Sequence, residues 1–196
     1  MYDALTTSIR AWNERVLAAI EACTGEQGQV DVGSIAATLS HATAWPGCPQ
    51  AAMLSSTSGA PSYRRIPLGT GAAHSNHEAL LIVWPPGYAT PIHDHDGLWG
   101  MEFVLDGVLE VESFRLLPQP PIHLEHDHSR IVGVGDHIAF SQADYAHRCR
   151  NLSRSRQALS LHVYGGELNR YRSFAHDRGQ WSSELHHAVR ERVAST

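Results

Sequence analysis

The sequence predicts a mainly β protein, an antiparallel sandwich or barrel preceded by short helices. Three observations support this. Apolar residues recur at helical spacing near the start of the chain, and a segment rich in Pro, Gly and Ser (residues 45–62) follows. From Tyr63 onward, short apolar runs alternate with turn residues. At 196 residues the chain is expected to form one domain, with a helical cap and loop at 1–62, a barrel at 63–175 and a polar tail at 176–196.

Two helices are predicted in the cap. The first presents an apolar face at three- and four-residue spacing, formed by Ile9, Trp12, Val16, Ile20 and Cys23. The second is shorter and covers residues 32–42, with Ile35, Leu39 and Ala42 on one face.

The predicted strands are four apolar runs bounded by turn residues. They are ALLIVW (79–84), MEFVLDGVLEVESF (101–114), HIAF (137–140) and ALSLHVYG (158–165). Strands of this regular, short kind favour an antiparallel architecture. The polar segment HDRGQWSSELHHAVRERV (176–193) indicates a last, weak helix.

Composition narrows the function classes. The net charge is -5, so no basic field indicates a nucleic-acid or membrane partner, and no apolar stretch reaches the length of a membrane span. All 15 basic residues are arginine, which excludes a Schiff-base lysine. Three separated cysteines without a CxxC pair favour a reduced, cytoplasmic protein. The 14 histidines make metal chemistry the class to test.

Two histidines lie one residue apart in the stretch HDHDGLWG (93–100). On a strand, His93 and His95 point to the same face, and Gly87 with the adjacent prolines suits a strand that begins at a barrel rim. Neutral imidazoles suit Zn, Fe, Ni or Cu(II), with a third ligand from elsewhere. The alternative is a pair of solvated loop histidines.

Here the sequence resembles the cupin family, whose first motif runs glycine, five residues, His-x-His, three or four residues, glutamate, six residues, glycine. Gly87, His93, His95 and Gly107 fit every spacing, and Gly100 stands in the place of the glutamate. The resemblance implies a cupin (jelly-roll-like) β-barrel with a metal ion at the two histidines.

The second cupin motif ends in histidine, three residues and asparagine, which His147 and Asn151 match, although the Pro-x-Gly upstream is absent. The resemblance implies that His147 is the third ligand. A similar short pair, His126 and His128, lacks the flanking glycines and is interpreted as a solvated loop where metal binding would be adventitious.

Three histidines without a carboxylate leave a facial set of coordination positions free for a chelating anionic substrate and dioxygen. Such a site with this surrounding sequence is similar to the thiol dioxygenases. The animal enzymes carry a cysteine in the glutamate position, which forms a thioether with a tyrosine. Gly100 cannot do this, so that tyrosine is expected to remain a free phenol.

The tyrosine lies in the stretch SLHVY (160–164), where Ser160, His162 and Tyr164 face one way along a strand. Inside a barrel these groups need hydrogen bonds, whereas a half-exposed strand would leave them in water. The stretch matches the Ser-x-His-x-Tyr triad of cysteine dioxygenases, which implies a relay that aims the Tyr164 hydroxyl at the cavity.

Arg65 occupies the position of the arginine in the Tyr-x-Arg segment of cysteine dioxygenases, where it pairs with the substrate carboxylate. In 3-mercaptopropionate dioxygenases a glutamine stands there. Arg64 is interpreted as a solvated surface residue and Cys149 as a small buried hydrophobe. Trp99 either walls the pocket or belongs to the core.

The resemblance therefore implies an Fe(II)-dependent cysteine dioxygenase that forms cysteine sulfinic acid from L-cysteine and O2. Its metal ligands would be His93, His95 and His147, with Arg65 binding the substrate and Tyr164, His162 and Ser160 catalytic. Two alternatives remain. One is a dioxygenase of 3-mercaptopropionate or another thiol acid, and the other is a non-catalytic metal- or ligand-binding cupin.

Overall fold

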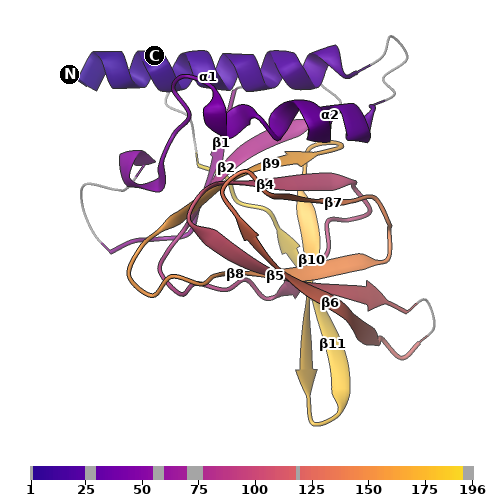
Figure 1. The fold of residues 1–196 in the computed structure, drawn as a ribbon. Helices are drawn as coiled ribbons and strands as arrows, with labels where there is room; N and C mark the ends of the chain where they lie inside the picture. Colours follow the sequence, from indigo (N-terminus) through magenta and orange to yellow (C-terminus); the bar gives the residue numbers. More distant parts are fainter. Residues whose placement is uncertain (1, 25–29, 55–59, 70–76, 118–119, 192–196) are drawn as a thin grey trace.

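The computed structural model describes residues 2–24, 30–54, 60–69, 77–117 and 120–191. Two antiparallel sheets face one another, and the helices lie across the outer face of one of them (Figure 1). This confirms the predicted mainly β class. The cupin-like arrangement consists of two sheets of five and six strands.

The helical part is the cap that the sequence predicted. It contains α1 (Tyr2–Ala22), α2 (Val32–Leu39) and two short 3₁₀ helices, η1 (Ala42–Ala44) and η2 (Ala51–Leu54). Asp31 begins α2 by accepting a hydrogen bond from the Ser34 amide at 3.1 Å.

The two sheets divide the strands as follows. The five-stranded sheet has the order β1-β2-β9-β4-β7, formed by β1 (Arg64–Pro67), β2 (Glu78–Trp84), β9 (Ala158–Tyr164), β4 (Gly100–Asp106) and β7 (His137–Phe140). The six-stranded sheet has the order β11-β10-β3-β8-β5-β6, formed by β11 (Gln180–His187), β10 (Arg170–Asp177), β3 (Ile92–His93), β8 (Tyr145–Asn151), β5 (Val108–Leu116) and β6 (Leu124–Gly133).

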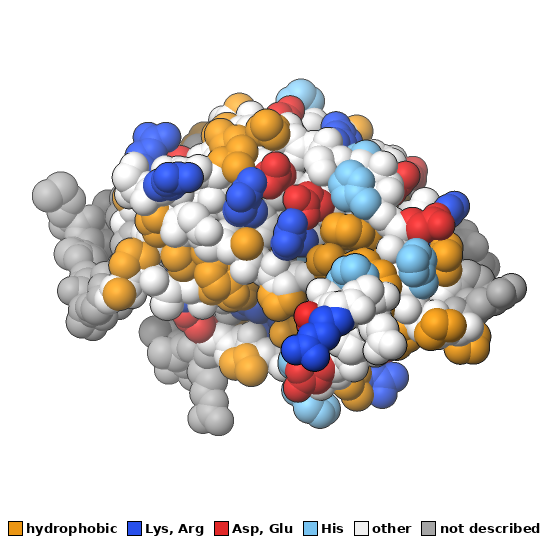
Figure 2. Space-filling view, turned by 90° about the horizontal axis from the view of Figure 1, so that it is seen from below, with side chains coloured by type: hydrophobic (Ala, Val, Ile, Leu, Met, Phe, Trp, Pro, Cys, Tyr) orange, Lys and Arg blue, Asp and Glu red, His pale blue; other side chains and the backbone are white. Residues whose placement is uncertain are grey.

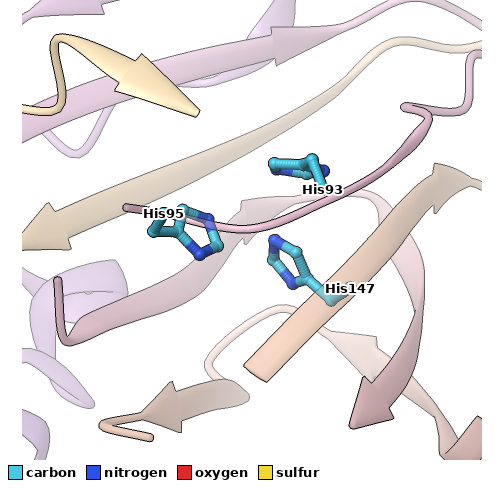
Figure 3. Close-up of side chains that lie close together, drawn as sticks. All are labelled: His93, His95 and His147. Atoms are coloured by element: carbon cyan, nitrogen blue, oxygen red, sulfur yellow. The ribbon is translucent and has the colours of Figure 1, made fainter. Parts of the chain in front are cut away.

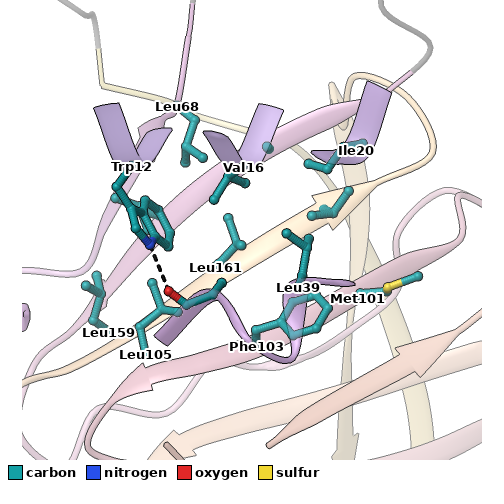
Figure 4. Close-up of a cluster of buried hydrophobic side chains, with 14 of the residues drawn as sticks. Trp12, Val16, Ile20, Leu39, Leu68, Met101, Phe103, Leu105, Leu159 and Leu161 are labelled. Atoms are coloured by element: carbon teal, nitrogen blue, oxygen red, sulfur yellow. Dashed lines mark hydrogen bonds between the residues drawn. The ribbon is translucent and has the colours of Figure 1, made fainter. Parts of the chain in front are cut away.

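The largest hydrophobic cluster lies between the helices and the five-stranded sheet, and a second one joins side chains of the two sheets. Trp12, Val16 and Ile20 of α1 are fully buried against the outward side chains of β9 and β4 (Figure 4). The indole N–H of Trp12 donates to the carbonyl of Ala42 at 2.9 Å, which ties α1 to the following segment. Because the helices cover the outer face of β9 and the second sheet covers the inner face, all seven residues of β9 are buried.

Two sequence interpretations are wrong at the level of local structure. The segment predicted as a last, weak helix contains the end of β10 and all of β11, which pair as a hairpin. Most of β11 is exposed, so its sequence lacks the alternation of a half-buried strand. His126 and His128 lie on β6 rather than in a loop, although both are exposed as expected.

No helix in the described ranges is long and apolar enough to cross a membrane. The face of the molecule away from the helices carries basic and acidic side chains intermingled, with several exposed histidines (Figure 2). Two ion pairs join β8 to β5: Arg148 pairs with Glu112, and Arg150 with Glu110.

Candidate active site and metal centre

Three histidines converge between the two sheets. His93 ends β3 and lies directly opposite His147 of β8 in the strand pairing, while His95 follows two residues after His93 (Figure 3). One nitrogen of each residue lies within 4.8 Å of one nitrogen of the others. The structure therefore brings together the three residues that the sequence predicted as ligands, although His95 lies just beyond the strand.

The ring nitrogens fit a metal ion. Both nitrogens of His95 and Nε2 of His147 are buried and have no hydrogen-bond partner within the described part of the chain. His93 is oriented by its Nδ1, 3.0 Å from the carbonyl of Pro91. Burial, reinforced by His147, lowers the pKa of His93 to about 3, and burial also lowers the pKa of His95 and His147. Three neutral imidazoles with free nitrogens are suitable ligands for a divalent transition metal.

The glutamate position of the motif is closed by Phe140. A Cβ on Gly100 would lie 2.4 Å from the Phe140 ring and 3.0 Å from the ring of Tyr164. Phe140 stacks on His95 at a centroid distance of 4.5 Å. Packing therefore requires glycine at this position.

A carboxylate nevertheless reaches the site from Glu102, which sequence reasoning missed. Glu102 is 4% exposed, and its Oε1 lies 3.4 Å from His147 Nε2 and 3.3 Å from His162 Nδ1. Burial favours its protonated form, but the imidazoles of His147 and His162 outweigh burial and hold the pKa of Glu102 below its usual range. The available signal was its position two residues after Gly100, on the same face of a strand whose other residues are apolar or glycine up to Asp106.

Cys149 is buried as expected, but it is more than a small hydrophobe. Its Sγ donates to Glu102 Oε2 at 3.4 Å and lies 3.6 Å from His147 Nδ1. Burial raises the pKa of this thiol well above its usual value, so Cys149 remains a neutral donor.

The predicted relay is present and buried. Ser160 Oγ lies 2.8 Å from His162 Nε2, and His162 Nδ1 lies 3.1 Å from the Tyr164 hydroxyl. Trp84, which the sequence did not place here, donates its indole N–H to Ser160 Oγ at 2.7 Å. The half-exposed alternative is wrong, because the second sheet covers the polar side of β9 and leaves Ser160, His162 and Tyr164 at most 3% exposed. Burial raises the pKa of Tyr164 well above its usual value, so the phenol keeps its proton.

A pocket of about 330 Å³ reaches His93 of the three histidines and is also lined by Arg65, Tyr164 and Tyr171, among others. Nε and Nη2 of Arg65 are buried without a hydrogen-bond partner in the described ranges. An unpaired buried guanidinium is costly, so its place on this wall favours an anionic ligand.

The structure also shows where Arg64, Trp99 and residues 187–191 lie relative to the pocket. Arg64 is not solvated, because it forms a two-point ion pair with Glu191 at 2.5 and 2.8 Å. Trp99 packs against the core beneath the helices and does not line the pocket. Residues 187–191, predicted as polar tail, form part of the pocket wall, and the Glu191 amide donates to the Arg65 carbonyl at 2.9 Å.

The family model described as cysteine dioxygenase type I matches residues 26–177, more than half of the chain. The chain belongs to the cysteine dioxygenase type I family. This confirms the resemblance found in the sequence. The matched segment contains the three converging histidines and the hydrogen-bonded Ser160, His162 and Tyr164.

The solved structures that align with this cysteine dioxygenase family member share little sequence identity with it. An oxalate oxidase aligns at 18% identity and a TM-score of 0.39, over 47% of this chain and 43% of its own. The TT1209 protein of Thermus thermophilus aligns at 21% identity and a TM-score of 0.41, over 58% and 91%. The cupin domain of Schizosaccharomyces pombe Cnp3 aligns at 9% identity and a TM-score of 0.42, over 57% and 66%. This chain thus spans less than half the length of the oxalate oxidase chain.

Proposed function

We propose that this protein is an Fe(II)-dependent dioxygenase that oxidises L-cysteine with O2 to cysteine sulfinic acid. The thiol and one O2 give the sulfinic acid, with both oxygen atoms added to sulfur and no further reductant consumed. The observation that carries the proposal is the buried, unpaired guanidinium of Arg65 on the same pocket wall as His93 and Tyr164.

The iron would be held by His93, His95 and His147, which can each turn one nitrogen to a common point; both nitrogens of His95 and Nε2 of His147 have no hydrogen-bond partner in the described structure. Fe(II) bound there supplies the acidity that deprotonates a thiol near neutral pH and the redox chemistry that dioxygen needs. The pocket orients the substrate so that its sulfur faces the histidines.

Arg65 binds the substrate carboxylate. Its two free nitrogens suit a paired, directional contact with the two carboxylate oxygens, and burial strengthens that contact. The substrate is therefore held at one end by the guanidinium and at the other by its sulfur. This arrangement selects a small thiol with a carboxylate a few bonds from sulfur.

Tyr164 acts as a hydrogen-bond donor to the reacting groups. It lines the pocket, keeps its proton because it is buried, and is oriented by His162 and Ser160. A phenol fixed in this way holds a proton near the developing negative charge without releasing it.

The proposal is tested by oxygen uptake of anaerobically iron-loaded protein, with L-cysteine and 3-mercaptopropionate in parallel and the products identified by mass. Uptake with cysteine much faster than with 3-mercaptopropionate, giving cysteine sulfinic acid, supports it. A preference for 3-mercaptopropionate supports the dioxygenase reaction but contradicts L-cysteine as the substrate. No uptake with either thiol at full iron occupancy favours a binding protein instead.

A further inference from the structure

Glu102 stands directly opposite His162 in the pairing of β4 with β9. Its Oε1 lies 3.3 Å from His162 Nδ1, and the hydroxyl oxygen of Tyr164 lies 3.1 Å from the same nitrogen. Nδ1 therefore faces two oxygens in a buried site. Whether it carries a proton determines which way the hydrogen bond with Tyr164 runs.

The opposite ring nitrogen is constrained by Trp84. An indole N–H can only donate, and that of Trp84 donates to Ser160 Oγ at 2.7 Å. Of the two groups bonded to this hydroxyl in the described structure, only His162 can accept its proton, at 2.8 Å. A neutral imidazole that accepts at Nε2 carries its proton on Nδ1.

Glu102 favours the same tautomer from the other side. A carboxylate only accepts hydrogen bonds, so an unprotonated Nδ1 at 3.3 Å would set two lone pairs against one another where little water screens them. A protonated Nδ1 is attracted to the carboxylate instead. The Cys149 thiol donates to Oε2, which leaves Oε1 free to accept from His162. Nε2 of His147 lies 3.4 Å from Oε1 but is the nitrogen that would face the metal, so it donates no hydrogen bond to Oε1.

We propose that Glu102 is a positioning residue for Tyr164: acting through His162, and together with Trp84 and Ser160, it fixes the imidazole in the tautomer that carries its proton on Nδ1. Tyr164 then accepts from His162, and its own hydroxyl proton points into the pocket. The consequence for catalysis rests on the proposed function, whereas the tautomer itself does not.

Nitrogen-15 NMR of the histidine rings tests the tautomer directly. The probe is the protein loaded with zinc alone, which is diamagnetic, and the His162 signals are identified by their loss in His162→Gln. We expect a protonated Nδ1 and an unprotonated Nε2 in the wild type and in Glu102→Asp. In Glu102→Gln, whose amide can donate to Nδ1, the fraction protonated on Nε2 is expected to rise, although Trp84 and Ser160 still favour a proton on Nδ1. A wild type protonated on Nε2, or an unchanged tautomer in Glu102→Gln, overturns the inference.

Turnover separates positioning from a structural role. Glu102 does not line the pocket, so Glu102→Gln is expected to lower kcat at least about tenfold while KM for the thiol stays within about twofold. The matched control is Glu110→Gln, which removes a carboxylate paired with Arg150 on the surface and should leave kcat unchanged. An unchanged kcat in Glu102→Gln contradicts the role. If Glu102→Gln does not fold, the tautomer of His162 in the wild-type spectrum still tests the inference. A wild-type protein that is inactive on every thiol overturns the proposed function and leaves the tautomer untouched.

Discussion

The ring of Phe140 occupies the space that a side chain at Gly100 would need. A Cβ at Gly100 would approach Phe140 Cζ to 2.4 Å, and the same ring stacks on His95 and on Tyr145. Gly100 also lies directly opposite Tyr164 in the strand pairing. The absence of a ligand at position 100 is therefore a packing requirement that also keeps His95 in place.

Gly100→Cys should consequently destabilise the protein by roughly 1–3 kcal/mol, because the added atoms overpack a filled core. We also expect no covalent link to Tyr164, which intact mass would reveal as the loss of two hydrogens. Thermal unfolding measures the stability. The control is Gly33→Ala in α2, where an added Cβ meets its nearest atom at 3.4 Å. A Gly100→Cys protein as stable as the wild type would show that Phe140 yields easily.

Metal retention should depend on the buried histidines and not on the exposed pair. His95→Ala removes a proposed ligand whose side chain is 2% exposed, and we expect iron or zinc occupancy to be lost, measured by elemental analysis after dialysis. His128→Ala is the matched control, because His128 is exposed on β6 beside Asp127. Full occupancy in His95→Ala would place the metal elsewhere.

Arg65→Gln should raise KM for cysteine about 10- to 100-fold while the metal stays bound, because a charge-assisted contact to the carboxylate is lost. Steady-state kinetics with cysteine and with 3-mercaptopropionate measure the effect on each thiol. Arg148→Gln, which breaks a surface pair with Glu112, controls for loss of charge. If KM is unchanged in Arg65→Gln, another group holds the carboxylate.

Much of the site could be predicted from the sequence because its residues lie in short, strictly spaced motifs. Residues two apart on a strand lie on the same side in the folded protein. This holds for Ser160, His162 and Tyr164, which are hydrogen-bonded in sequence, and for the closely spaced His93 and His95. The position of Glu102 on the inner face of its strand could be inferred, but its contact with His162 could not, because that contact depends on the pairing of β4 with β9, which brings together residues 60 positions apart.

In the fold, too, locally patterned elements could be predicted and tertiary contacts could not. The apolar faces of α1 and β9 were predicted from their periodicity, since each buries a regular set of side chains. The hairpin of β10 and β11 was missed because most of its side chains are exposed and no apolar pattern specifies it. The return of residues 187–191 to the pocket is a tertiary contact, made through Arg64 and Glu191, that no local pattern records.

The helical cap should contribute substantially to stability. Trp12→Ala removes a fully buried indole and its hydrogen bond to Ala42, so we expect a loss of about 3–5 kcal/mol in the free energy of unfolding, measured with denaturant. Glu14→Ala, on the exposed side of α1, should change it by less than about 0.5 kcal/mol. Equal effects of the two substitutions would show that α1 packs only loosely on the sheet.

The most direct test of the central claim is a single turnover of the iron-loaded protein with L-cysteine under isotopically pure ¹⁸O2, with the product analysed by mass spectrometry. The account predicts cysteine sulfinic acid in which both oxygens on sulfur are heavy, since both come from one O2 molecule. A product with one heavy oxygen, or a disulfide with none, would contradict a dioxygenase.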